Sequence, residues 1–567
     1  QTHSLRFETA IRAAFVESAS KDKKQFLPRD AFSRIVSKDR VRRELTNLRP
    51  GIIPPEKLEW YIDEVWHTTR SGSRGKPTTR RTIFAILALI EKVDAIVDFV
   101  DQNIHDSDLP FVISNGSSPG TRQLNRKGRD GQLTEISIVS SWPTFVLEAF
   151  NEYQWRLLAP YFTLSTKAKP QILHYRLDDG IILPFIEDDE ISSGDKGGYG
   201  EVWKVKIHPA HHNCFQDGAS DDDNPPYAVK RLRHSNPVAF KAEVSNLKRF
   251  STKDHLHLIK LLVTFEWRSQ YYLLFPFADG NLLDFWKRYP TSEDLPRNYG
   301  LARWFSSQCL GLAQGLRMIH TVEFKQDEFL DIHPKEQEKI HGRHGDLKPE
   351  NILWFRAIGA YLPDHNDHDE GCAMGLLKIS DFGLTRFHRT ASIFSKVEGG
   401  STPVSPTYRA PEYDIARFVD QSYDIWTLGC VLLEFVAWYL LGWEEVDRFS
   451  KERTVDDKKQ IKEDVFFNNV DILEGDKPAQ TGAQAKRSVA NEFQTLYQHE
   501  ACTDFVIDLL EFIETRLMRM GPEKRANCEE IVQKFTELND MCKTDRAYCT
   551  SRVKTPPTRA RTDLSLL

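Results

Sequence analysis

The chain has 567 residues, of which 40% are hydrophobic and 28% are charged, and its formal net charge is -6. This length is too great for one compact core, so we expect more than one domain. The ordinary composition and small net charge give no sign of a protein that binds nucleic acid or a membrane surface, and we expect neither as a partner.

Eight cysteines are scattered along the chain without a CxxC pair. This usage favours reduced thiols over a disulfide framework. The sequence begins at Gln1 and shows no charged and then apolar segment of the secretory type. We therefore expect a cytoplasmic protein, with the nucleus as the alternative.

Residues 1–112 carry a helical pattern. Phe7, Ile11 and Phe15 recur at the spacing of one helical face, and the strongest helix is predicted over 80–104, where apolar residues alternate by three and four. The flanking positions lack paired opposite charges, which favours a bundle helix over a dimeric coiled coil. We predict a mainly α-helical N-terminal domain, a candidate for recognising a protein partner or for self-association.

A polar, glycine-rich and basic run follows at 114–132. Its composition is typical of a flexible linker or a long loop with solvated charges. Apolar and aromatic residues return with mixed period over 134–164, which indicates a folded segment of unassigned type. We treat 113–180 as a linker that leads into the next domain.

A glycine-dense turn lies between two alternating stretches at 191–206, ISSGDKGGYGEVWKVK. Two strands joined in this way suit a flap over phosphates, because residues without a β-carbon let backbone N–H groups approach an anion closely. Gly197 and Gly200 have the right spacing relative to Val202, whereas Asp195 stands where a first glycine is expected.

A polar loop at 207–226 carries three histidines and Cys214. Their irregular spacing makes a structural metal site the less favoured interpretation. The strand that follows ends in Lys230, and Glu243 lies in a helical segment beyond it. A lysine and a glutamate on neighbouring elements can pair and so direct the ammonium group at phosphate oxygens.

Two further strands are predicted at 258–265 and 271–277, and the chain then becomes mostly helical as far as the segment HGDLKPENIL at 344–353. In that segment Asp346 can accept the proton of an attacking hydroxyl, Lys348 can neutralise a moving phosphoryl group, and Asn351 can hold a hard cation. A second acid, Asp381, ends the strand at 377–381. Phosphoryl transfer requires this combination.

The run at 425–443, IWTLGCVLLEFVAWYLLGW, is long enough to span a bilayer and carries one charge, Glu434. It lacks flanking basic clusters, and a large enzyme also needs one helix that is buried on all sides. We therefore favour a buried core helix.

These pieces, in this order, resemble the eukaryotic protein kinase family over residues 186–538. The resemblance implies an α+β, bilobal kinase fold at 181–540, with a β-rich N-lobe at 181–277 and a helical C-lobe at 278–540, preceded by the helical domain at 1–112. It also implies ATP and Mg²⁺ as cofactors and protein as the substrate. Lys348, Pro349 and Glu350 are of the serine/threonine type.

The resemblance also implies roles for individual residues. The catalytic positions are Asp346 as the base, Lys348, Lys230 and the partner of that lysine, Glu243. The ligands of Mg²⁺ are Asn351 and Asp381. ATP is expected between the lobes, at Gly197, Gly198, Gly200, Val202, Ala228, Lys230, Phe275, Pro276, Ala278 and Leu353. The activation segment and its supports include Phe382, Gly383, Ser405, Asp424 and Glu412, which pairs with Arg525.

Two positions depart from the family pattern. Asp195 replaces the first glycine of the loop, and Gly345 stands where most regulated members have an arginine that receives a phosphate on the activation segment. The second departure predicts activity that needs no such phosphorylation. Both departures support the alternative, a silent kinase fold that acts as a scaffold or signalling adaptor.

The connections at 321–340, 355–371 and 453–500 are longer and more charged than the motif spacing requires. We interpret them as tolerated insertions, with docking surfaces as the alternative. The end of the chain, 541–567, is basic, polar and short of core residues, and we predict that it is disordered.

Overall fold

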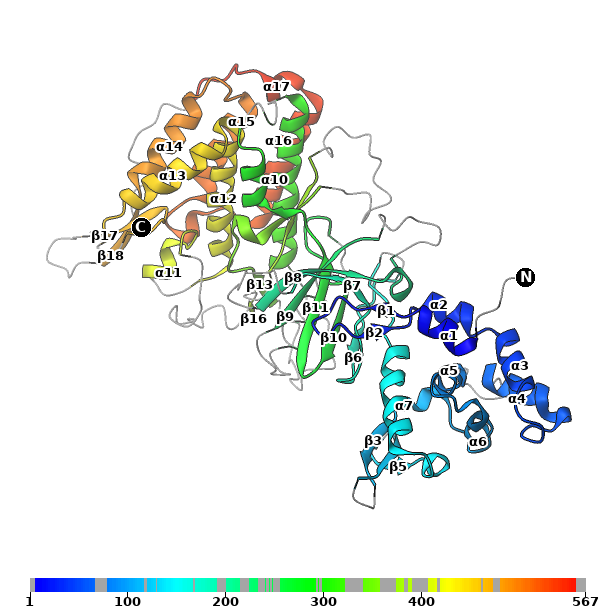
Figure 1. Ribbon diagram of the computed structural model, residues 1–567. Helices are drawn as coiled ribbons and strands as arrows, with labels where there is room; N and C mark the ends of the chain where they lie inside the picture. The colour runs from blue at the N-terminus through cyan, green and yellow to red at the C-terminus, as the bar shows by residue number, and fades with distance from the viewer. Residues whose placement is uncertain are drawn as a thin grey trace. The chain divides into compact units, whose positions relative to one another are not determined.

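Figure 1 shows a computed structural model of the chain, a mixed α and β structure. It describes residues 6–556 except for 67–78, 117–119, 129, 167–168, 191–199, 215–223, 233–239, 241–243, 245–246, 248–254, 292–293, 295–297, 322–339, 357–373, 382–385, 390–405, 416–418, 460–461 and 473–479. The chain divides into two compact units, Gln1–Ser235 with Leu262–Phe277 and Asn236–Leu261 with Ala278–Leu567.

The first unit begins with a helical region that has its own core. Its helices are α1 (Phe7–Ala13), α2 (Arg29–Ile35), α3 (Lys38–Thr46), α4 (Leu58–Trp66), α5 (Arg81–Leu89), α6 (Ile96–Asp101) and α7 (Thr144–Leu157). Every residue of α5 from Ile83 to Leu89 is buried, so this helix forms the centre around which the others pack.

The helix predicted over 80–104 is in fact two helices. Helix α5 ends at Leu89, and Glu91 takes a φ of 57°, a conformation that stops an α-helix. The chain then turns back into α6, which brings Asp106 to the first turn of α5. There its carboxylate accepts hydrogen bonds from the backbone N–H groups of Thr82 (3.0 Å) and Ile83 (2.9 Å). A cap from such a distant residue leaves no local pattern.

The interpretation of 114–132 as a flexible linker or loop was wrong for the residues that the structure describes. Strands β3 (Val112–Asn115), β4 (Arg122–Lys127) and β5 (Leu133–Glu135) form an antiparallel sheet. Leu124 is buried in the helical core, and the Asn125 amide donates to the carbonyl of Val112 at 3.1 Å. Few apolar side chains are needed, because only Leu124 and Asn125 in these strands are fully buried.

A short hairpin, β1 (Val16–Glu17) with β2 (Gln25–Phe26), interrupts the predicted helical region. The hairpin connection bonds to the edge of the large sheet of this unit, since the Ala19 N–H donates to Phe185 O at 2.7 Å. Close by, Ser18 Oγ donates to Leu183 O at 2.7 Å. The N-terminal region and the sheet are therefore joined by direct hydrogen bonds.

That sheet has six strands in the order β6-β10-β11-β9-β8-β7 (Figure 1). All neighbours are antiparallel except β6 and β10. The bounds are β6 His174–Arg176, β7 Phe185–Asp188, β8 Gly200–Ile207, β9 Tyr227–Leu232, β10 Val263–Trp267 and β11 Gln270–Pro276. One face buries Trp203, Val229 and Leu274 in a second core.

The second unit is mainly helical (Figure 1). Its helices are α9 (Leu282–Arg288), α10 (Tyr299–His320), α11 (Pro411–Ile415), α12 (Gln421–Leu441), α13 (Trp443–Val455), α14 (Arg487–Gln498), α15 (Asp504–Phe512), α16 (Cys528–Thr544) and α17 (Arg546–Thr550). Its strands are β12 (Gly280–Asn281), β13 (Ile340–Arg343), β14 (Ile352–Phe355), β15 (Leu376–Ile379), β16 (Arg386–Arg389), β17 (Phe467–Ile472) and β18 (Gln480–Ala485).

Helix α12 is the core helix predicted at 425–443. Among the described residues it is the one helix long and apolar enough to cross a membrane, and nearly all of it is buried inside the protein. The Phe435 ring lies 4.5 Å from the ring of Phe305 and 5.8 Å from that of Trp286, measured between centroids. The prediction of a helix buried on all sides is confirmed.

The prediction of disorder from residue 541 onward was wrong as far as residue 556. Helix α16 continues to Thr544, and α17 buries Tyr548 and Cys549. The Tyr548 hydroxyl donates to Asp508 at 2.7 Å, and Asp545 caps α17 through its side chain. Two buried side chains are enough to dock a polar segment, while residues 557–567 lie outside the described part of the chain.

Candidate active site

The segment at 344–353 brings together three of the predicted site residues. Strand β13 leads into it, and a short 3₁₀ turn, Pro349–Asn351, leads out of it into β14. Lys348 Nζ lies 3.1 Å from Asp346 Oδ2, and the Asn351 amide donates to the same oxygen at 3.0 Å. A second bond from that amide to the Asp346 carbonyl, at 2.7 Å, fixes its orientation. The acid is thus held between a cation and an amide.

Asp381 is joined to this segment through the β14–β15 ladder. Ile352 pairs with Ile379, and both the N–H and the hydroxyl of Ser380 donate to the Asn351 carbonyl, at 2.8 and 3.0 Å. Asp381 comes next and has a φ of 57°. The two predicted metal ligands therefore lie at the same end of one strand pair.

Their chemistry fits Mg²⁺, which is usually bound by one or two protein oxygen ligands together with substrate phosphates. In the part of the chain that the structure describes, no group of three or more His, Cys, Asp and Glu residues could hold a metal ion. A cation at Asn351 and Asp381 would therefore need further oxygens from a phosphate or from water.

Asp424, in the first turn of α12, holds the backbone at the start of the segment 344–353. Its carboxylate is fully buried and accepts from the N–H groups of His344 (2.7 Å) and Gly345 (2.8 Å). It also accepts from His320 Nε2 at 2.8 Å. Burial alone would raise the pKa of Asp424, but the hydrogen bond and charge of His320 outweigh it and hold that pKa below its usual range. Asp424 is therefore an ionised anchor.

His320, the last residue of α10, carries the matching charge. Burial alone would lower the pKa of His320, but the Cys528 sulfur, 3.2 Å from Nδ1, and the Asp424 carboxylate raise it to about 10. Sequence reasoning missed His320 because its partner lies 104 residues away and no periodic pattern connects the two.

This pair predicts a pH dependence of stability. In an unfolded chain a histidine has a pKa of about 6.5. The pair therefore stabilises the folded state fully below about pH 6.5, and the contribution is lost as the pH rises through about 10. We expect the melting temperature of His320→Gln to fall less steeply than that of the wild type between these limits. Thermal unfolding at a series of pH values measures the two melting temperatures. If they change with pH to the same extent in the wild type and in His320→Gln, the expectation is contradicted.

Glu412 and Arg525 form the ion pair that the resemblance implied. Arg525 Nη1 and Nη2 lie 2.7 and 2.8 Å from the two oxygens of Glu412, and both side chains are buried. Glu412 lies in α11 and Arg525 follows a 3₁₀ turn just before α16. The end of the predicted activation segment is thereby tied to the helical core of the second unit.

In the first unit, predicted nucleotide-contacting residues share one face of the sheet. Val202 on β8 is opposite Lys230 on β9, and Phe275 on β11 is opposite Ala228 on β9. Directly opposed residues, and residues two apart on one strand, point to the same face. This face is the reverse of the one that forms the core, and Val202 is 45% exposed on it. An apolar side chain left exposed beside a lysine suits a ligand with an apolar ring and phosphates.

Of the remaining predicted site residues, some lie in the described part of the chain and others do not. Gly200 begins β8, Pro276 ends β11, Ala278 lies just before β12, and Leu353 on β14 pairs with Asn281. Other positions lie outside the described residues: Asp195, Gly197, Gly198, Glu243, Phe382, Gly383 and Ser405.

The histidines of the loop at 207–226 make hydrogen bonds within the first unit. His211 Nδ1 lies 2.8 Å from Pro160 O, and its Nε2 accepts from the N–H of Arg29 at 3.2 Å. Burial lowers the pKa of His211 to about 4, so the ring is neutral. His212 Nε2 lies 2.9 Å from the Asn224 side-chain oxygen. These contacts join the loop to α2 through Arg29, to Pro160 and to itself.

Comparison with known proteins gives one family match and several distant relatives. The family model described as "Protein kinase domain" matches residues 214–535, more than half of the chain, and begins after the glycine-dense run. A probable leucine-rich repeat receptor-like serine/threonine-protein kinase of Arabidopsis thaliana is 24% identical over 268 residues, 45% of this chain and 21% of that protein. Cold-responsive protein kinase 1 of the same plant is 26% identical over 256 residues, 44% of this chain and 52% of that protein.

The chain therefore spans between about a fifth and about half of the length of these two relatives. A putative receptor-like protein kinase of Arabidopsis thaliana is similar to the same extent, with 27% identity over 244 residues, 42% of this chain and 22% of that protein. None of these three matches reaches half of this chain.

Proposed function

The chain belongs to the protein kinase domain family, and from this premise we propose that it transfers the γ-phosphoryl group of Mg·ATP to serine or threonine hydroxyls of proteins. The observation that carries the proposal is the arrangement around Asp346, whose carboxylate lies beside Lys348 and Asn351 on a backbone held by Asp424. The serine/threonine type is supported by Lys348-Pro349-Glu350 and by the descriptions of the relatives.

In this proposal the residues of the chain have distinct tasks. Asp346 accepts the hydrogen bond of the acceptor hydroxyl and takes its proton as the new O–P bond forms and the bond between the γ-phosphorus and the departing ADP breaks. The Asn351 amide keeps the acid in one orientation, while Lys348 offsets the charge that spreads over the transferred group. Lys230 binds the α- and β-phosphates. Bound at Asn351 and Asp381, Mg²⁺ supplies positive charge to the β- and γ-phosphates.

The direct test is transfer of labelled phosphate from γ-labelled ATP to dephosphorylated casein and myelin basic protein, with Mg²⁺ present and then chelated. We expect incorporation on serine and threonine that chelation abolishes. Binding of ATP without any transfer to these proteins, or to a degenerate peptide library, would instead favour the scaffold alternative, which Asp195 and Gly345 support.

We further propose that activity does not require phosphate on the activation segment. Gly345 carries no side chain that could bind such a phosphate, and its N–H is bonded to Asp424. The nearest arginine, Arg343, is buried, donates to Val419 O at 3.0 Å and lies 5.8 Å from the centroid of the Tyr423 ring. These contacts direct its guanidinium into the second unit.

Accordingly, protein treated with a phosphatase is expected to retain its rate of transfer to casein. The measurement compares initial rates before and after treatment, with removal of phosphate verified by mass spectrometry. The proposal fails if the treated protein is inactive and phosphorylation between residues 384 and 405 restores turnover.

A further inference from the structure

The insertion at 453–500 contacts the end of the predicted activation segment. Arg409 stands just before Ala410-Pro411-Glu412, and its side chain is 7% exposed. One of its nitrogens, Nη2, lies 2.6 Å from Glu463 Oε2, and Nε lies 3.0 Å from Asp414 Oδ1. Glu463 belongs to the insertion, whereas Asp414 is on α11. The insertion is therefore joined to residues 408–414 by a buried cation.

Lys459 completes this set of charges. Its Nζ lies 2.7 Å from Glu463 Oε2 and 3.6 Å from Asp414 Oδ2, so two cations alternate with two carboxylates. The hydrogen bond from Arg409, and then that from Lys459, lower the pKa of Glu463 to about 2. Glu463 is therefore ionised at physiological pH and can pair with both cations.

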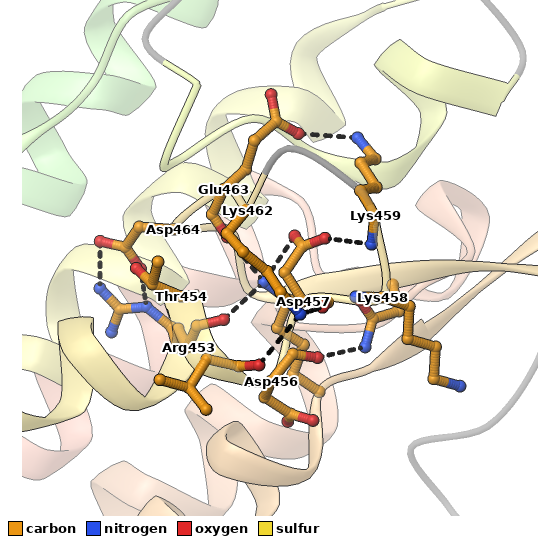
Figure 2. A network of polar contacts seen from close by, with 12 residues as sticks. Arg453, Thr454, Asp456, Asp457, Lys458, Lys459, Lys462, Glu463 and Asp464 are labelled. Atoms are coloured by element: carbon orange, nitrogen blue, oxygen red, sulfur yellow. Dashed lines mark hydrogen bonds and ion pairs between the residues drawn. The ribbon is translucent and has the colours of Figure 1, made fainter.

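A second set of contacts involves Tyr408, the residue next to Arg409. The Tyr408 hydroxyl donates to Glu434 Oε2 at 2.7 Å, and the other oxygen of that carboxylate lies 2.6 Å from Arg453 Nη2. Arg453 also reaches Asp464 Oδ1 at 2.7 Å, as Figure 2 shows. Its guanidinium carbon is 4.1 Å from the centroid of the Phe466 ring. Arg453 and Tyr408 thus share one carboxylate, that of Glu434 on α12.

The loop that carries Glu463 is also held by a lysine of the same insertion. Lys486, which is fully buried, donates to Arg453 O (2.7 Å), Asp457 Oδ2 (2.9 Å) and Glu463 O (2.9 Å). An ammonium group has three N–H donors, and here all of them are used. Figure 2 shows polar contacts among the labelled residues of this segment, from Arg453 at the end of α13 to Asp464. The backbone at Glu463 is therefore held by a contact that does not involve Arg409.

We propose that the segment made of the end of α13 and the described residues after it, with Glu463 and Lys486, holds residues 408–414 in the conformation that receives the protein substrate. It thereby serves in place of the phosphate-binding arginine that is absent at Gly345. The inference rests on the proposed function, because it assigns regulation and substrate binding to that same site. Arg409 and Glu463 act as positioning residues, since they act on the substrate through the backbone of 408–414.

The test is Glu463→Gln, which preserves the size of the side chain and removes its charge. Its matched control is Asp447→Asn, on an exposed carboxylate of α13 that pairs with Lys451. We expect Glu463→Gln to raise the KM for casein about tenfold, the scale of one lost charge-assisted hydrogen bond. The KM for ATP should be unchanged, and Asp447→Asn should match the wild type in both constants. A role limited to stability would not separate the two KM values.

Hydrogen exchange of the amides at 406–415 is the second measurement. We expect faster exchange there in Glu463→Gln, with strands β9 and β11 unaffected. If the wild type phosphorylates casein and Glu463→Gln has the same KM, the inference is overturned while the proposed function stands. If no protein is phosphorylated by the wild type, the proposed function fails. The hydrogen-exchange rates at 406–415 then test only whether Glu463 anchors this segment. Equal rates in the wild type and in Glu463→Gln would contradict that anchoring.

Discussion

Asp346→Asn is expected to abolish measurable transfer of phosphate to protein while the fold is retained. The amide has the shape of the carboxylate but cannot accept the proton of the attacking hydroxyl. General base catalysis of this kind contributes about a hundredfold to ten-thousandfold to a rate. The variant also removes the negative charge beside Lys348, whose Nζ lies 3.1 Å from Asp346 Oδ2. The change therefore affects chemistry and leaves packing unaltered.

Single-turnover transfer from labelled ATP to casein measures this effect, and a thermal shift on addition of Mg·ATP shows that nucleotide still binds. Asp447→Asn serves again as the control, because it makes the same chemical change at an exposed ion pair of the second unit. Equal incorporation by wild type and Asp346→Asn would mean that the label comes from another source. The scaffold alternative would then be the better description of the protein.

The short-range part of the site was predictable from the sequence. Asp346, Lys348 and Asn351 lie within six residues, so their spacing alone indicated that they act together. The link between Glu412 and Arg525, which are 113 residues apart, came only from the likeness to a family. His320 had no such signal.

The errors have one physical cause, because local composition does not show what a distant segment will cover. Residues 114–132 were expected to be a loop, since polar strands with one buried apolar side chain, Leu124, have almost no apolar alternation. Residues 453–500 were interpreted as a tolerated insertion, and their charges gave no sign that some of them would be buried. In the structure Arg453 is fully buried, because carboxylates from α12 and from its own loop surround it. A charged side chain such as that of Arg453 can be buried here because residues from other parts of the fold supply the opposite charge.

The N-terminal helices illustrate the same limit. Their apolar period was strong enough to predict a helical bundle, and the core around α5 agrees with it. The break at Glu91 and the hairpin at 16–26 depend on turns and on contacts with Phe185, which periodicity does not report.

Arg525→Ala is expected to destabilise the second unit severely. The guanidinium has five N–H donors, and each has a protein acceptor. Two contact Glu412, at 2.7 and 2.8 Å, and the others reach carbonyls at 3.1 Å or less, those of Arg519, Ser422 and Met520. Removing it leaves a buried carboxylate without its charge partner, which costs about 3 to 5 kcal/mol. Loss of three carbonyl contacts adds to that cost.

Urea unfolding of the second unit measures the change, and Arg516→Ala is the matched control. Arg516 also pairs with a glutamate at 2.9 Å, but both side chains are more than 40% exposed, so its removal should cost about 1 kcal/mol or less. Arg525 contacts no residue that we place at the reacting groups, so we expect Arg525→Ala to lose stability before it loses chemistry. Because Glu412 lies within residues 408–414, the comparison is made at saturating casein, where the folded variant, measured well below its melting temperature, should approach the wild-type rate. A protein that is inactive yet fully folded would show instead that the ion pair acts on the chemistry, and an unchanged unfolding midpoint would contradict its role in stability.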